Sequence, residues 1–233
     1  MGDASVDVWV RDTALGAAPP EGGRDADRLD PLDPLDQHER DRWARLGDGP
    51  SARAYVKLHV LARSQIGRFL GRSPESLRFD RTCPDCGRQH GRPLLVDDPG
   101  LHLSLSRAGT VVALALTRSG PVGVDVEQVA GTQFEGFGQV ALHARERGNG
   151  GAVGGGVATA NATAWVRKEA ALKALGVGLR VDPASFVTPR EGVLAEVVPG
   201  LPWVSVVDVD APTGCVAAVA LASGSGPLEV RHH

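Results

Sequence analysis

Hydrophobic and polar residues alternate with the period of a β-strand in several stretches of the chain. This alternation places one set of side chains on each face of a strand, and it is typical of strands that are buried on one side. The stretches predicted as strands are 5–10, 101–105, 111–117, 122–127, 203–209 and 215–221, with further candidates at 77–79, 185–188 and 193–198. The chain therefore has a substantial β content.

Two other stretches show the helical period. Apolar residues recur every three to four positions over 51–70, and good helix formers fill 161–175, so each stretch predicts a long helix. Asp36 followed by Glu39 has the spacing of a capping box, which predicts that a third helix begins after Asp36 and runs to about residue 46.

The order of these elements indicates an α+β fold with two similar lobes, because helices precede strands in each half of the chain. We expect an N-terminal lobe over 1–118, a C-terminal lobe over 119–222 and a tail over 223–233. A short helix is predicted at 139–147, and the glycine-rich stretch 148–156 is predicted as a loop.

Composition narrows the class of protein. Among the 233 residues, 42% are hydrophobic, which is enough for a packed core, yet no apolar run has the ~20 residues of a membrane helix. Three cysteines, an odd number, and no visible signal peptide lead us to expect a cytoplasmic protein. The basic residues lack interleaved aromatic residues, so nucleic acid is not an expected partner.

Candidate chemistry lies on one strand and one helix. Asp125 and Glu127 are two apart on a predicted strand and so point to the same side. Glu169 and Lys173 are four apart on a predicted helix and share a face. Lys168 precedes Glu169, although the whole chain has only three lysines. Three carboxylates and two lysines meeting in a cleft would suit Mg²⁺ and phosphate.

Four motifs carry a resemblance to a known family. Their order is Gly91-Arg-Pro93, Leu103-Ser-Leu-Ser-x-x-Gly109, Gly123-x-Asp-x-Glu127 and Trp165-x-x-Lys-Glu-Ala-x-x-Lys-x-x-Gly176. Together they resemble the signature of the 4′-phosphopantetheinyl transferases, over about residues 36–180. The length resembles the two-lobe Sfp-type branch, in which two α/β lobes lie in a pseudo-twofold arrangement with the active site between them.

The resemblance implies an Mg²⁺-dependent transferase. It would move the 4′-phosphopantetheine arm of coenzyme A to a serine of an acyl or peptidyl carrier protein, as used in fatty acid, polyketide or nonribosomal peptide synthesis, and release 3′,5′-ADP. Asp125, Glu127 and Glu169 would bind the metal. Glu169 would also accept the serine proton, Lys173 would stabilise the leaving group, and Asp125 would contribute to catalysis. Two lobes in one chain suggest a monomer.

Other residues would hold coenzyme A. The resemblance implies that Arg92 and Arg53 bind its 3′-phosphate, that Ser104 contacts the nucleotide, and that Lys168 and Lys173 lie on the phosphates. Arginine suits the first role because it binds phosphate through two parallel hydrogen bonds. Leu105 departs from the family pattern, which usually has a histidine that touches the nucleotide.

Alternatives remain open at this point. A non-catalytic coenzyme A or carrier-binding module and an unrelated metal-dependent phosphohydrolase would both fit the same carboxylates. Cys83-x-x-Cys86 with His90 resembles half of a zinc knuckle, against the simpler interpretation of reduced cysteines in a turn. Trp165 is expected to be a packing residue between the lobes rather than a ligand contact.

Overall fold

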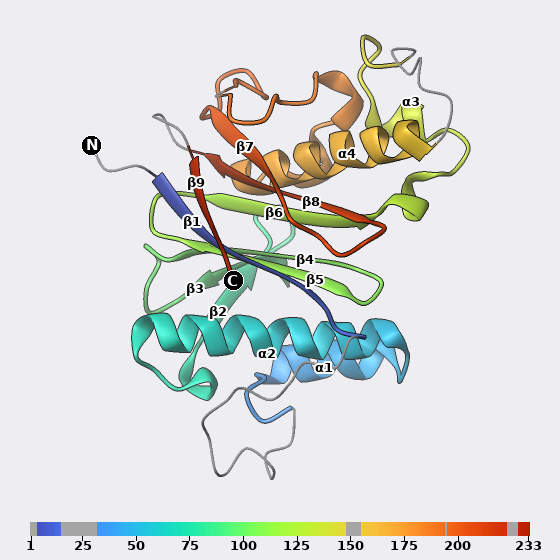
Figure 1. Ribbon diagram of the computed structural model, residues 1–233. Helices are drawn as coiled ribbons and strands as arrows, with labels where there is room; N and C mark the ends of the chain where they lie inside the picture. Colours follow the sequence, from blue (N-terminus) through green and yellow to red (C-terminus); the bar gives the residue numbers. More distant parts are fainter. Residues whose placement is uncertain (1–3, 15–31, 148–154, 194, 223–227) are drawn as a thin grey trace.

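The computed structural model describes residues 4–14, 32–147, 155–193, 195–222 and 228–233 (Figure 1). Its helices are α1 (Gln37–Leu46), α2 (Pro50–Leu70), α3 (Phe137–Ala141) and α4 (Gly155–Leu175). Its strands are β1 (Ala4–Asp12), β2 (Phe79–Thr82), β3 (Gln89–Leu95), β4 (His102–Ala108), β5 (Val111–Thr117), β6 (Val122–Gln128), β7 (Val204–Val209), β8 (Cys215–Ala222) and β9 (Leu228–His232). Short 3-10 turns at Pro74–Ser76, Val129–Thr132, Gly178–Arg180 and Pro183–Ser185 connect them.

The strands form three sheets, and the content is mixed α+β. One sheet has four strands in the order β4-β5-β1-β9, the second has three in the order β6-β8-β7, and β2 and β3 form a separate hairpin. Pairing within the two larger sheets is antiparallel except between β1 and β9. No helix in the described part of the chain is both long and apolar enough to cross a membrane.

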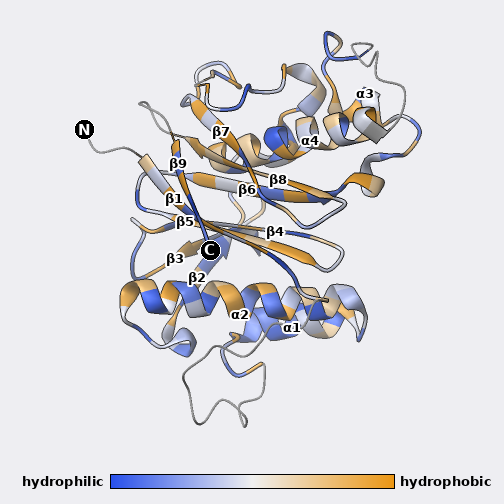
Figure 2. Ribbon diagram, in the orientation of Figure 1, coloured by the Kyte–Doolittle hydropathy of each residue, from blue (hydrophilic) through white to orange (hydrophobic). Residues whose placement is uncertain are grey.

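The two larger sheets pack face to face, with a helix on each outer side (Figure 1). Strands β5 and β8 show how the sequence builds these layers, because their residues are hydrophobic on both faces (Figure 2). Ala113 and Ala115 of β5 face the core between the sheets, whereas Leu114 and Leu116 pack beneath α2. On β8, Val219 faces the same central core and its neighbours Ala218 and Ala220 pack against α4.

Helix α1 begins as the sequence predicts. The Asp36 side chain accepts from the Glu39 N–H, and the Glu39 carboxylate accepts from the Asp36 N–H, which is the expected capping box. Glu39 is also buried, and it forms ion pairs with Arg63 of α2 and Arg81 of β2. This buried network joins α1, α2 and the β2–β3 hairpin.

Several predicted elements differ from the structure. The stretch 185–188 begins at the last residue of a 3-10 turn and forms no strand, and within 193–198 the described residues contribute only an isolated bridge between Ala195 and Val204. The helix predicted over 139–147 is limited to Phe137–Ala141, and the strand predicted at 77–79 begins only at Phe79. Most of the predicted loop 148–156 lies outside the described residues.

The C-terminal stretch is the clearest correction to the expected tail. Within 223–233, Leu228–His232 forms β9, which pairs in parallel with β1 from Ala4↔Leu228 to Val8↔His232. Leu228 and Val230 pack against the central core. The end of the chain therefore belongs to the sheet that contains the first strand.

Candidate functional site

The site forms where α4 crosses β6. Gly123 makes this crossing possible, because a Cβ atom at this position would lie 2.0 Å from the Ala170 carbonyl oxygen and 2.6 Å from the Ala174 nitrogen. Real side chains do not approach that closely, so the absence of a side chain lets the helix pack directly on the strand. This contact places the helix residues next to the acidic face of β6.

Asp125 is the centre of the polar contacts. The β6 valines Val124 and Val126 point into the core between the sheets, so Asp125 points the other way, as the alternation predicts. The Lys173 ammonium donates to Asp125 Oδ1 at 2.6 Å and to the Val124 carbonyl oxygen at 3.1 Å. The Ser106 hydroxyl donates to the same carboxylate oxygen at 2.7 Å. Asp125 is thus a buried carboxylate that is satisfied by one cation and one hydroxyl.

The carboxylates of Glu127 and Glu169 have fewer hydrogen-bond partners than that of Asp125. Glu127 accepts from the Gln128 N–H at 3.0 Å, whereas Glu169 Oε1 is buried and has no hydrogen-bond partner among the described residues. Burial, aided by the Asp125 charge, raises the pKa of Glu169. Burial also raises the pKa of Glu127. Both carboxyls would therefore gain from an added cation.

The oxygen atoms of Asp125, Glu127 and Glu169 are not all close enough together to bind one ion as they stand. Among the described residues, three His, Cys, Asp or Glu ligand atoms lie within 4.8 Å of one another only at Cys83, Cys86 and His90. Lys173 holds Asp125, and the Gln128 N–H holds Glu127. A shared ion would have to displace the ammonium and draw Glu127 away from the backbone.

Serine hydroxyls join β4 to β6 beneath this acidic face. The two strands are edge strands of different sheets, so no ladder connects them. Instead, the Ser104 hydroxyl accepts from the Val124 N–H at 3.0 Å, and Ser106 accepts from the Val126 N–H at 3.4 Å. The alternating serines of this motif therefore hold β6 in place where its carboxylates emerge.

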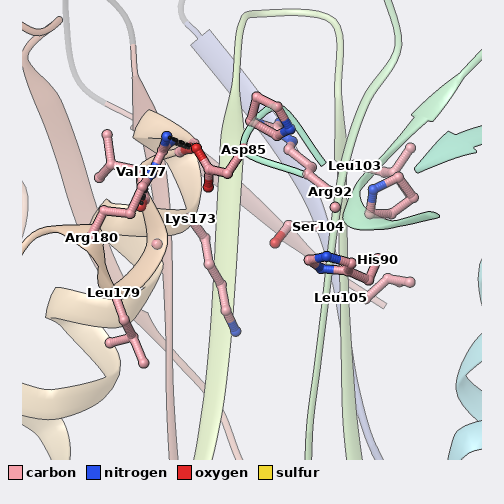
Figure 3. Close-up of a pocket in the computed structure, with 15 residues that line it drawn as sticks. Asp85, His90, Arg92, Leu103, Ser104, Leu105, Lys173, Val177, Leu179 and Arg180 are labelled. Atoms are coloured by element: carbon pink, nitrogen blue, oxygen red, sulfur yellow. Dashed lines mark hydrogen bonds and ion pairs between the residues drawn. The ribbon is translucent and has the colours of Figure 1, made fainter. Parts of the chain in front are cut away.

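A cavity of about 570 Å³ opens beside Lys173. Figure 3 shows Lys173 of α4 on one side and Arg92, Ser104 and His90 on the other. Its lining residues are Pro84, Asp85, His90, Gly91, Arg92, Pro93, Leu103, Ser104, Leu105, Lys173, Gly176, Val177, Gly178, Leu179 and Arg180. The cavity combines apolar walls with a few cationic groups, as small-molecule sites commonly do.

The Arg92 guanidinium is only partly satisfied by hydrogen bonds to the described residues. Its Nη2 donates to the Val122 carbonyl oxygen at 3.3 Å, but its Nε is buried without a partner among the described residues. Burial lowers the pKa of Arg92. An anion entering the cavity would satisfy this donor and offset the cost of burying the charge.

Two residues expected to bind coenzyme A do not line the cavity. Lys168 is fully buried on another side of α4, where its ammonium donates to Glu146 at 2.8 Å and to the Ala141 and Pro183 carbonyl oxygens, each at 2.9 Å. Arg53 lies at the start of α2 and donates to the Asp48 carbonyl oxygen at 3.0 Å. Arg92, Ser104 and Lys173 are the members of the expected set that the structure brings together.

Other residues of the cavity were not expected from the sequence. Asp85 of the β2–β3 turn and Arg180, just after α4, form an ion pair at 2.9 Å across its rim (Figure 3). Their separation of 95 positions leaves no local signal that could have paired them. Trp165 packs edge-on against Phe137, with ring centroids 6.1 Å apart, so it has a packing role. Both residues lie within 119–222, so this contact is not one between the two expected lobes.

Comparison with known families gives an independent indication. Residues 121–196 match the model of the 4′-phosphopantetheinyl transferase superfamily, over less than half of the chain. The match includes Asp125, Glu127, Glu169 and Lys173, and it indicates phosphopantetheine transfer in general. No curated protein matches the chain.

Proposed function

We propose that the protein is an Mg²⁺-dependent 4′-phosphopantetheinyl transferase of the Sfp type. It would transfer the phosphopantetheine arm of coenzyme A to a serine of an acyl or peptidyl carrier protein and release 3′,5′-ADP. The observation that best supports this function is the position of Asp125 and Lys173 beside a cavity that is also lined by Arg92, whose buried Nε has no partner among the described residues. The superfamily match over 121–196 points to the same chemistry.

The chemistry of the three carboxylates suits a divalent metal ion once Lys173 releases Asp125 and Glu127 leaves the Gln128 N–H. Glu169 Oε1 is buried and has no partner among the described residues, and burial raises the pKa of both Glu169 and Glu127. Hard carboxylate oxygens are the ligands that Mg²⁺ prefers. Asp125, Glu127 and Glu169 would hold the ion, which when bound would neutralise negative charge on the phosphoryl group during transfer.

The remaining roles follow from what each side chain contacts. Glu169 would accept the proton of the attacking serine, since its buried Oε1 has no hydrogen-bond partner among the described residues. Lys173 would exchange its bond with Asp125 for one to the leaving phosphate. Arg92 would bind the 3′-phosphate, and Ser104 would contact the nucleotide. Lys168 would position α4 through its three buried hydrogen bonds, rather than touch the substrate.

The finer architecture belongs to the same proposal. Lobes at 1–118 and 119–222 in a pseudo-twofold arrangement would place the cavity between them, because it is lined by residues from both ranges. Two lobes in one chain would let the protein act as a monomer, and the odd number of cysteines favours the cytoplasm.

Intact-mass analysis of a carrier protein tests the function. The protein is incubated with coenzyme A, Mg²⁺ and an apo-carrier, and the carrier should gain the mass of one phosphopantetheine group. Binding of coenzyme A or the carrier without an adduct would instead indicate a non-catalytic binding module. Release of nucleotide without a carrier would indicate a phosphohydrolase.

Two substitutions test the assigned groups. Glu127→Ala and Lys173→Ala should each slow transfer by about 100-fold or more, because each removes a charge that acts on the transferred phosphate. Glu135→Ala and Lys57→Ala are matched controls at exposed positions and should leave the rate unchanged. Near-normal turnover of either Glu127→Ala or Lys173→Ala would contradict the role given to that residue.

A further inference from the structure

A cysteine-containing turn forms one wall of the cavity and takes no part in the proposed transfer. Cys83 follows β2, Cys86 lies three residues later, and His90 is the second residue of β3. One sulfur or nitrogen atom from each of these three side chains lies within 4.8 Å of the other two. The closest pair is Cys86 Sγ and His90 Nε2, at 2.9 Å. The hairpin therefore gathers two thiols and an imidazole at one point.

Hydrogen bonds shape the turn that carries Cys83 and Cys86, and some of them end on the Cys86 sulfur atom. The Gly87 N–H donates to the Cys83 carbonyl oxygen at 2.8 Å, and Gly87 has a φ of 71°, which favours glycine. The Arg88 side chain donates to Cys86 Sγ through Nε at 3.5 Å, and its backbone N–H also donates to this thiol. The Arg88 guanidinium therefore places a positive charge beside a sulfur atom that would bind the metal.

The donor set selects the kind of ion. Two thiolates and an imidazole suit Zn²⁺, whereas Mg²⁺ requires oxygen ligands. With Zn–S about 2.3 Å and Zn–N about 2.0 Å, ligand atoms around a tetrahedral ion lie roughly 3.5–3.8 Å apart. The three ligand atoms here lie within 4.8 Å of one another, and the 2.9 Å between Cys86 Sγ and His90 Nε2 would have to widen by about 0.6 Å around the ion. No fourth His, Cys, Asp or Glu ligand atom joins the group within the described chain.

We propose that Cys83, Cys86 and His90 bind a zinc ion, with a water molecule as the fourth ligand. The ion fixes the β2–β3 hairpin as a wall of the cavity. His90 and Arg92 both line the cavity, and Asp85, inside the same turn, holds the Arg180 guanidinium on the opposite rim. Zinc therefore positions Arg92 and the Asp85–Arg180 ion pair together. This inference stands independently of the transferase reaction.

Metal analysis of the purified protein tests the site. Protein expressed with zinc and purified without chelators should contain about one zinc ion per chain. Cys86→Ser and His90→Ala should lose most of it, whereas Cys215→Ser, which changes the cysteine outside the cluster, should retain it. Co²⁺ in place of zinc should give the thiolate charge-transfer band and the intense visible bands of a tetrahedral site.

Two results would overturn the proposal. One is wild-type protein that binds no zinc even after reconstitution under reducing conditions. The other is a zinc content of Cys86→Ser and His90→Ala equal to that of Cys215→Ser. Circular dichroism checks that the variants fold. If neither does, the Co²⁺ spectrum of the wild type decides: a thiolate band supports the site, and its absence rejects it.

Discussion

Gly123→Ala tests the close crossing of α4 and β6 on which the site depends. The added methyl group would lie 2.0 Å from the Ala170 carbonyl oxygen, 2.6 Å from the Ala174 nitrogen and 2.9 Å from Lys173 Cβ. Two of these atoms belong to the helix backbone and cannot rotate away. The helix as a whole would have to move off the strand by about 1 Å or more, because carbon atoms pack at roughly 3.5–4.0 Å.

We expect this movement of α4 to lower the free energy of unfolding. Overpacking a core typically costs 1–3 kcal/mol, and we expect about 3 kcal/mol because the obstacle is backbone. For a chain of this size each kcal/mol lowers the melting temperature by ~2–4 °C, so the expected decrease is about 6–12 °C. Displacing α4 would also move Glu169 and Lys173 relative to Asp125, so transfer should slow even in protein that remains folded.

Thermal and urea unfolding measure the effect, and Gly138→Ala provides the matched control. A Cβ at Gly138 in α3 would meet no atom within 4 Å, and the backbone there has no positive φ. Alanine should therefore stabilise this helix position by up to about 1 kcal/mol, the opposite sign. Equal stability of the two variants would show that α4 does not pack against Gly123 as described.

Two further predictions concern buried charges. Lys168→Ala should destabilise the protein by about 3–5 kcal/mol, measured by urea unfolding, because it leaves the Ala141 and Pro183 carbonyl oxygens without this donor and removes the cation from Glu146. Glu146 would keep its hydrogen bonds from the His143 and Thr188 N–H groups. A loss no larger than that of the exposed Lys57→Ala would refute the buried position. Burial opposes ionisation of Glu39, but hydrogen bonds and charges from His59 and Arg63 outweigh it and lower the pKa of Glu39 from 4.5 to about 2. Because the folded-state pKa is the lower one, this stabilisation is complete above about pH 4.5 and is lost as the pH falls toward 2. Glu39→Gln should therefore flatten the dependence of the urea midpoint on pH over that interval, and an unchanged slope would contradict the assignment.

Local sequence patterns predict a helix or strand well when residues within that element determine its structure. The capping box at Asp36 and the alternation on β5 and β8 depend on neighbouring residues, and the structure confirms them. The stretch 185–188 has strand-forming residues, but no neighbouring strand pairs with it. Conversely, Leu228–His232 alternates only briefly, and it becomes a strand because β1 offers a free edge far away in sequence.

In the candidate site too, local sequence patterns predict some positions, whereas others depend on residues distant in the chain. The strand period alone places Asp125 on the face opposite Val124 and Val126, and the structure confirms this. Lys168 is a different case, since residues adjacent in a helix point about 100° apart. Its neighbour Glu169 lies near Asp125, whereas Lys168 points into the interior beside Glu146. The ion pair between Asp85 and Arg180 depends on tertiary folding and has no counterpart in any local pattern.

The proposed transfer requires that Asp125, Glu127 and Glu169 share one divalent ion. Mn²⁺, which prefers the same oxygen ligands as Mg²⁺, makes this measurable by electron paramagnetic resonance in the presence of coenzyme A. We expect one tightly bound Mn²⁺ in the wild type and in Cys86→Ser, and loss of that ion in Glu127→Ala. Wild-type protein that binds no Mn²⁺, or Glu127→Ala that binds it equally well, would contradict the claim.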